Sequence, residues 1–159
     1  MVQASSHAVV DDRFGTPVPV GFAAVSGPDE VAALAGWPPE GFPGPDLVAV
    51  LAADLGDVLA ETLDALRPVL HEIVCCDGRA DAADRVPSGS DLATRALELG
   101  LGEDFVYTVP TAEGALDHAV RSIATGNSGW SGRAVLVVGS AVVVQRARDH
   151  LDDRSPGSA

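Results

Sequence analysis

Gly139 and Ser140 are two residues suited to chemistry, because they lie between an apolar run and a pattern typical of a helix. Backbone N–H groups at the start of a helix attract anions, and a glycine there lets a phosphate approach closely. The turn could therefore bind an anion. A strand–Gly–Ser–helix turn is also common in α/β sheets, and this commonness favours a purely structural turn.

Acidic side chains follow two other apolar runs of the sequence. Asp54 and Asp57 come just after one run, and Asp77 directly follows the next. Ligands of open α/β sheets bind beyond the carboxyl ends of the strands, so we expect these carboxylates and Ser140 to gather on one rim. There they could hold Mg²⁺ or receive a basic loop of a partner protein. Each could equally cap its own helix or turn, and for Asp57 capping is the favoured interpretation.

Several arrangements that catalysis commonly uses are missing from the sequence. All ten basic residues are arginine, so the chain offers no phosphate-loop lysine and no Schiff-base amine. It also has no Gly-x-Ser-x-Gly elbow and no Gly-x-Gly-x-x-Gly fingerprint. The histidines have no metal-ligand spacing and indicate structural or surface roles: His7, His71, His118 and His150. We therefore predict no catalytic residue and no metal site.

Short apolar runs must position these residues. A continuous apolar run suits a strand that is buried on both faces, and helical patterns separate the runs. We expect strands at residues 47–53, 72–76, 105–109 and 134–138. We expect helices at residues 57–66, from a cap at Ser90 to Leu99, from Thr111 onward, and at residues 141–151. This alternation predicts a Rossmann-like three-layer α/β domain with a mainly parallel sheet.

The N-terminal third has a weaker pattern. We expect a strand at residues 20–25, with the nearby prolines before it or at an edge, a short helix at 29–35 and an extended loop at 37–45. We expect a disordered or loosely packed segment at residues 1–15, one domain at residues 16–151 and a disordered tail at residues 152–159.

Composition and charge exclude some classes of partner. The net charge of the 159 residues is −13, which argues against nucleic acid and against an anionic membrane surface. Cys75 and Cys76 are neighbours that point to opposite faces of a strand, which indicates buried thiols in a reducing cytoplasm. The sequence shows neither a signal peptide nor an apolar stretch of the ~20 residues that a membrane span needs. We expect a cytoplasmic protein, and nothing in the sequence points to a particular oligomeric state.

The last strand–helix unit, Ala134-Val-Leu-Val-Val-Gly-Ser-Ala-Val-Val-Val-Gln-Arg-Ala-Arg148, carries a family resemblance. It resembles the final strand, Gly-Ser turn and helix of the C-terminal domain of folylpolyglutamate synthase/dihydrofolate synthase, in the Mur ligase superfamily. Val48-Ala-Val-Leu51 and Arg67-Pro68-Val69 resemble the first strand–helix unit of that domain. The resemblance covers residues 47–151 and implies a Rossmann-like fold and a shared ancestry.

The chain departs from this family where the family binds ATP. Members carry an Asp-Gly-Ala-His-Asn-Pro segment at the ATP site, whereas Ala23-Ala-Val-Ser-Gly-Pro28 keeps only the proline. Leu55-Gly56-Asp57 stands where the family has a lysine among acidic residues, and the phosphate loop and central ATPase domain have no counterpart. Phosphoryl transfer needs cations around the transferred group, so the resemblance implies the fold and not the activity.

The expected function is that of a stand-alone, non-catalytic homologue, a pseudoenzyme without a cofactor of its own. It would bind a small ligand or a partner protein, such as an ATPase or ligase half or another biosynthetic enzyme. The alternative is the C-terminal portion of an ATP-dependent amide ligase, which would use ATP and Mg²⁺ only with a separate ATPase domain. A third hypothesis, an independent Rossmann-like enzyme, has least support because no nucleophile–base or metal arrangement is visible.

Overall fold

The buried centre of the fold is a sheet built on the continuous apolar runs. The computed structural model describes residues 5–11, 16–25, 28–33, 47–67, 70–77, 89–124 and 134–154. Within these ranges the strands are β1 (Ser5–Asp11), β2 (Thr16–Ala24), β3 (Leu47–Ala52), β4 (Leu70–Cys76), β5 (Val106–Thr108) and β6 (Ala134–Gly139). The α-helices are α1 (Pro28–Ala33), α2 (Leu59–Leu66), α3 (Gly89–Glu98), α4 (Ala112–Ala124) and α5 (Ala141–Arg154). Two 3-10 helices are η2 (Ala53–Val58) and η3 (Glu103–Phe105).

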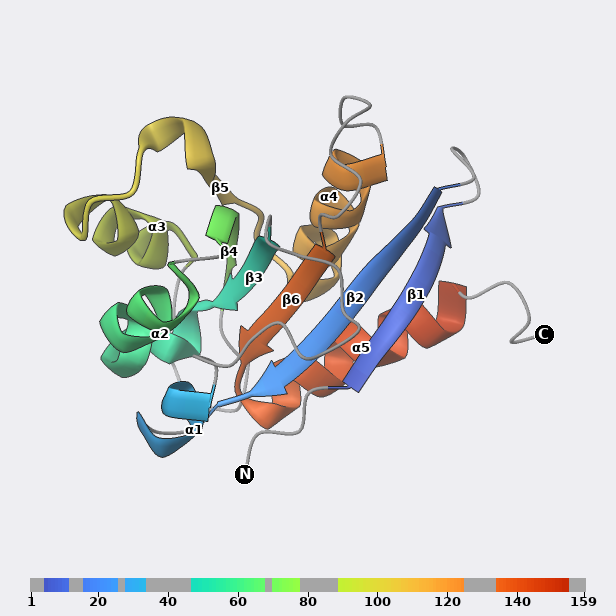
Figure 1. Ribbon diagram of the computed structural model, residues 1–159, viewed down its shortest axis with the longest axis horizontal. Helices are drawn as coiled ribbons and strands as arrows, with labels where there is room; N and C mark the ends of the chain where they lie inside the picture. Colours follow the sequence, from blue (N-terminus) through green and yellow to red (C-terminus); the bar gives the residue numbers. More distant parts are fainter. Residues whose placement is uncertain are drawn as a thin grey trace.

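The strands of the described ranges form one six-stranded sheet in the order β1-β2-β6-β3-β4-β5 (Figure 1). The five strands from β2 to β5 in this order run parallel to their neighbours. At the edge, β1 pairs with β2 in the antiparallel sense. The prediction of a Rossmann-like α/β domain with a mainly parallel sheet is therefore confirmed.

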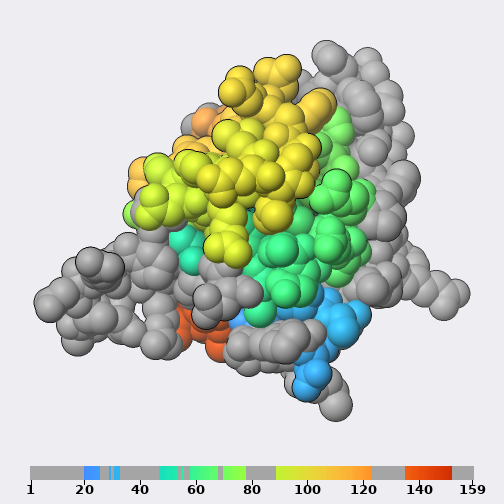
Figure 2. Space-filling view, turned by 90° about the vertical axis from the view of Figure 1, so that its left-hand side faces the viewer, coloured from blue at the N-terminus to red at the C-terminus, as the bar shows by residue number. Residues whose placement is uncertain are grey.

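Helices cover both faces of this sheet, because side chains alternate between the faces along each strand. Ala49 and Leu51 of β3 belong to a buried cluster that includes side chains of α1, α2 and α3. Val48 and Val50 belong to a second buried cluster, with side chains of α4 and α5. Figure 2 shows α2 and α3 side by side on the outside of the helical layer that covers the first cluster. None of the described helices is long and apolar enough to span a membrane.

The starts of three elements differ from the sequence prediction. The helix predicted at residues 57–66 is preceded by η2, and α2 itself begins at Leu59. Phe105, predicted as the first residue of a strand, instead ends η3, where its N–H donates to the Gly102 carbonyl at 3.0 Å. That turn uses the N–H that a strand would need for its neighbour, so β5 starts one residue later. β4 begins at Leu70, before the predicted start at residue 72.

The N-terminal segment contains a strand that the sequence analysis missed. The expectation that residues 1–15 are disordered or loosely packed is wrong for Ser5–Asp11, which pair along β2 as strand β1. An edge strand is held by backbone hydrogen bonds along one side and needs no continuous apolar run. The tail predicted at residues 152–159 also starts too early, because α5 extends to Arg154. Residues 1–4, 12–15 and 155–159 and the loop predicted at residues 37–45 lie outside the described residues.

The strand predicted at residues 20–25 begins earlier, at Thr16, and includes two prolines. Pro17 and Pro19 lie opposite β1, whereas pairing with β6 begins only at Val20. Both prolines therefore precede the part of β2 that has a strand on each side. This position agrees with the expectation that they lie at an edge or before the doubly paired strand, because proline has no N–H to donate.

The two cysteines end β4 and are fully buried on opposite faces of the sheet. Cys75 belongs to the cluster under α1, α2 and α3, and Cys76 to the cluster under α4 and α5. Neither cysteine forms a disulfide, as their adjacency predicted. Burial raises the pKa of the Cys75 thiol from an ordinary 9.0 to about 12, because the thiolate would lose its hydration.

This raised pKa predicts a loss of stability in alkali. The unfolded Cys75 ionises above pH 9.0 while the folded thiol stays neutral up to about pH 12, so the free energy of unfolding falls across this window. At pH 10.5 the loss assigned to this thiol is about 2 kcal/mol. Urea unfolding at pH 8.5 and at pH 10.5 measures it. In the Cys75→Ala variant, the free energy of unfolding should decrease much less between these two pH values. An equal decrease in the variant would show that another group causes it.

Candidate functional site

The candidate site predicted from the sequence lies at the carboxyl edge of the parallel strands. Leu51 of β3 pairs with Val138 of β6, and Ala52 pairs with Cys76 of β4, so these strands end at the same level. Ser140, η2 and Asp77 follow the three strand ends in turn. The backbones that carry Asp54, Asp57, Asp77 and Ser140 therefore follow neighbouring strand ends on one edge. The side chains of Asp54 and Asp57 lie outside the described part of the structure.

Asp77 holds the start of α3. Its Oδ1 atom accepts a hydrogen bond of 2.8 Å from the Gly89 N–H, twelve residues along the chain. Its own N–H donates to the Pro110 carbonyl at 3.1 Å, which extends the pairing of β4 with the β5 segment. Gly89 packs on the backbone of β4: a Cβ atom there would lie 2.9 Å from the Cys76 carbonyl carbon. The carboxylate therefore satisfies an N–H at a helix start, as a capping residue does.

The helix caps predicted from the sequence need two corrections. Ser90, predicted to cap α3, lies inside that helix, which begins at Gly89 and receives its carboxylate from Asp77. Asp57, for which capping was the favoured interpretation, lies inside η2, and the N-cap position of α2 is Val58, without a side-chain hydrogen bond. The 3-10 turns of η2 shift the start of α2 along the chain, beyond the position that a local pattern indicates.

Gly139 and Ser140 connect β6 to α5 by close packing. A Cβ atom on Gly139 would lie 2.9 Å from the Ala52 Cβ atom, which real Cβ atoms do not approach, so β6 can end beside β3 only with glycine here. The Gly139 carbonyl accepts a 2.8 Å hydrogen bond from the Val25 N–H. The Ser140 hydroxyl oxygen lies 3.5 Å from the Val143 nitrogen, a long capping bond at the start of α5. Packing thus accounts for the glycine, and capping accounts for the serine.

The histidines lie away from this edge or in contacts between elements. His150 of α5 lies 3.1 Å from each carboxylate oxygen of Asp117 in α4, so the pair links the two helices of one layer. The His118 ring lies 5.3 Å from the Tyr107 ring. Within the described ranges, no group of three or more His, Cys, Asp or Glu side chains could hold a metal ion.

Side chains at two described strand ends of the carboxyl edge do not favour a bound anion. The end of β2, where the resembling family has its ATP segment, has buried apolar side chains at Ala23 and Val25. These side chains donate no hydrogen bond to a phosphate. The Asp77 carboxylate, which follows β4 on the same edge of the sheet, adds negative charge. The edge is better suited to accept donors or cations than to hold an anion.

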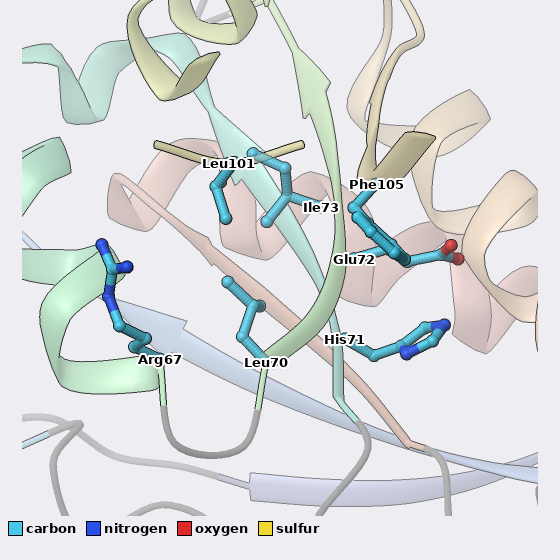
Figure 3. A pocket seen from close by; sticks show the side chains of 7 residues that line it. All are labelled: Arg67, Leu70, His71, Glu72, Ile73, Leu101 and Phe105. Carbon is cyan, nitrogen blue, oxygen red and sulfur yellow. The ribbon is translucent and has the colours of Figure 1, made fainter. Parts of the chain in front are cut away.

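A cavity that the sequence analysis did not find lies at the opposite, amino end of β4. Its volume is about 380 Å³, and Figure 3 shows the side chains that line it. These come from the end of α2, the start of β4 and the segment before β5, so they lie between residues 67 and 105. Leu101 and Phe105 lie far along the chain from residues 67–73, and no sequence signal could have grouped these two segments.

Comparison with known proteins relates the fold to one group of enzymes. No protein-family model and no curated protein matches the chain. It is similar to the folylpolyglutamate synthase of Mycobacterium tuberculosis complexed with ADP and AMPPCP, with 29% identity, a TM-score of 0.64 and coverage of 82% of this chain. A second structure of that enzyme, complexed with ADP, gives 27% identity, a TM-score of 0.66 and the same coverage. FolC of E. coli in complex with ADP gives 23% identity, a TM-score of 0.56 and coverage of 86% of this chain.

These similarities agree with the resemblance in the sequence. The chain spans 29% of the length of each of these three structures. The likeness to the E. coli protein is a likeness of fold alone. The chain has the Rossmann-like α/β architecture predicted from its sequence, and it is structurally similar to part of folylpolyglutamate synthase.

The role of Asp77 gives a testable prediction. The Asp77→Ala change removes the acceptor of the Gly89 N–H and should lower the free energy of unfolding by about 1 kcal/mol. The Asp77→Asn change keeps an acceptor oxygen and should lose less than half of that amount. Chemical denaturation of the three proteins measures the difference. Equal losses in the two variants would show that the negative charge of Asp77, and not the hydrogen bond, matters there.

Proposed function

We propose that this chain is a non-catalytic binding domain with the fold of a folylpolyglutamate synthase C-terminal domain. The observation that carries the proposal is the use of the carboxyl edge by the fold itself. Asp77 holds the start of α3, Gly139 is required by the packing against Ala52, and Ser140 caps α5. Asp77 and Ser140 would have to release the helix starts that they hold in order to serve a phosphoryl transfer, and this supports a non-catalytic role.

The partner that best fits this edge is a protein with a basic loop. The chain has a net charge of −13, and Asp54, Asp57 and Asp77 follow neighbouring strand ends. Complementary charge speeds association and favours cationic partners over nucleic acid. Cys75 and Cys76 are buried and form no disulfide, which suits a reducing compartment and supports the proposal of a cytoplasmic location.

A second candidate is an ATP-dependent carboxylate–amine ligase to which this chain contributes one domain. The similarity to ADP-bound folylpolyglutamate synthase favours it, since 82% of the chain superposes on part of that enzyme. ATP and Mg²⁺ would then be held mainly by a separate ATPase domain. The two candidates differ in one measurable property, because only the second predicts that the chain supports turnover.

A complementation assay separates the two candidates. The folylpolyglutamate synthase of M. tuberculosis is truncated to remove the segment that matches this chain, and ATP hydrolysis and folate glutamylation are measured with and without the chain. We expect no turnover above background from the chain alone, because it has no lysine to offer the transferred phosphoryl group. We expect no restoration in the mixture either, because Asp77 and Ser140 at the carboxyl edge are engaged at helix starts. The same assay with the enzyme's own excised segment is the positive control. Glutamylation restored by the chain would establish the ligase alternative.

The acidic rim gives a separate prediction. Changing Asp54 and Asp57 together to Asn removes two negative charges and should weaken the binding of cations or of a basic partner, with the melting temperature nearly unchanged. Calorimetry compares Mg²⁺ binding by the unchanged protein and by the double variant. Affinity purification compares the proteins that each of them captures from the native cells. The Asp64→Asn change, on the exposed side of α2, is the matched control. A lower melting temperature with intact binding would make both residues structural.

A further inference from the structure

The cavity at the amino end of β4 has the size and lining of a small-molecule site. Its volume of about 380 Å³ falls within the range of pockets that hold organic ligands, roughly 300–1,000 Å³. Four apolar side chains line it, namely Leu70, Ile73, Leu101 and Phe105. Ile73 is fully buried, whereas Phe105 is 45% exposed and so leaves part of its ring available to a ligand.

Arg67 brings a positive charge to this apolar cavity. It follows the last turn of α2, and Figure 3 shows it on the side opposite Phe105. Its guanidinium lies 3.7 Å from the Asp64 carboxylate, with the two side chains 56% and 77% exposed. A pair this long and this exposed is weak, because water screens it. The planar guanidinium has five N–H donors, enough to bind a second carboxylate in the two-point manner that arginine favours.

The acidic residue that borders the cavity is engaged elsewhere. Glu72 is 7% exposed, and its Oε1 atom accepts a 3.1 Å hydrogen bond from Ser122 of α4, on the other face of the sheet. Figure 3 shows its carboxylate beyond the Phe105 ring, away from Arg67. The His71 ring meets the Phe105 ring edge to face, with centroids 5.9 Å apart, and closes the same side. The two ends of the cavity therefore differ: one is aromatic and the other is cationic.

We propose that this cavity binds a small aromatic carboxylate. The ring of the ligand lies against Phe105 and the aliphatic side chains, and its carboxylate pairs with Arg67. Offset stacking and apolar burial provide most of the affinity, and the guanidinium provides the preference for an acid. A neutral apolar ligand would displace water from the Arg67 guanidinium without accepting its hydrogen bonds, so binding of such a ligand is disfavoured. For an anion without an apolar body, the attraction to Arg67 alone is too small to offset repulsion by the protein's net charge of −13.

This site is independent of the proposed function at the carboxyl edge. The cavity borders the start of β4, while Asp77 follows its end, so the two lie at opposite ends of one strand. Failure of a test on one leaves the other unaffected.

Titration with 2-naphthoate tests the proposal, with 2-naphthamide as the neutral ligand of the same shape. Calorimetry should give a dissociation constant of about 0.1–1 mM for the acid, in line with the affinity per atom of ligands this small, and at least about tenfold weaker binding of the amide. Amide chemical shifts should change at residues 67, 70–73 and 101–105 and stay constant at Asp77 and Ser140. Equal binding of acid and amide, absence of binding at about 10 mM, or shifts confined to other residues would overturn it.

Two exposed side chains can be changed without touching the core. Arg67→Gln should weaken 2-naphthoate binding about tenfold and abolish the preference for the acid, because one charge-assisted contact is lost. Phe105→Ala should weaken both ligands. Tyr107→Ala is the matched control, since Tyr107 is 40% exposed on the adjacent strand and lies outside this cavity, and it should leave both affinities unchanged. Unchanged naphthoate binding in Arg67→Gln, or an equal loss in Tyr107→Ala and Phe105→Ala, would contradict the proposal.

Discussion

Burial of the central strands on both faces is the constraint on which the rest of the molecule depends. All six residues of β3 are buried, and its neighbours are apolar along all of β6 and along residues 73–76 of β4. A sheet of this type needs helices on both sides, which requires parallel strands with crossover connections. Polar groups can then reach solvent only at the strand ends and the two outer edges. Any chemistry of the molecule is restricted to those places.

At the carboxyl edge, the needs of the fold compete with those of a ligand site. A helix that starts beside a strand end leaves N–H groups without partners, and a nearby carboxylate or hydroxyl satisfies them. Asp77 does so for α3 and Ser140 for α5, and the approach of β6 to β3 leaves space only for Gly139. The described side chains of Asp77 and Ser140 thus serve the scaffold at this edge.

The amino end of β4 is organised by different requirements. The register of β3 and β4 shifts between Leu47 and Val48, and Phe105 belongs to η3 and not to β5. The sheet is therefore incompletely covered at this corner, and a cavity remains between α2, β4 and the segment before β5. Glu72 faces the opposite layer, where its carboxylate accepts a hydrogen bond from Ser122. It therefore does not neutralise the positive charge of Arg67. A small defect in packing thus gives a site with an aromatic and a cationic end.

The sequence by itself determined the central strands, the helices between them and the parallel fold class, because burial on both faces requires apolar runs that are visible locally. It also placed Asp54, Asp57, Asp77 and Ser140 after strand ends, since this follows from chain order alone. Tertiary structure decided the strand β1, whose partner is the backbone of β2 and not an apolar core. It decided that Asp77, twelve residues away, holds the start of α3, where the local pattern indicated Ser90. The cavity beside Arg67 was likewise beyond the sequence, because its walls come from segments that meet only when the sheet forms.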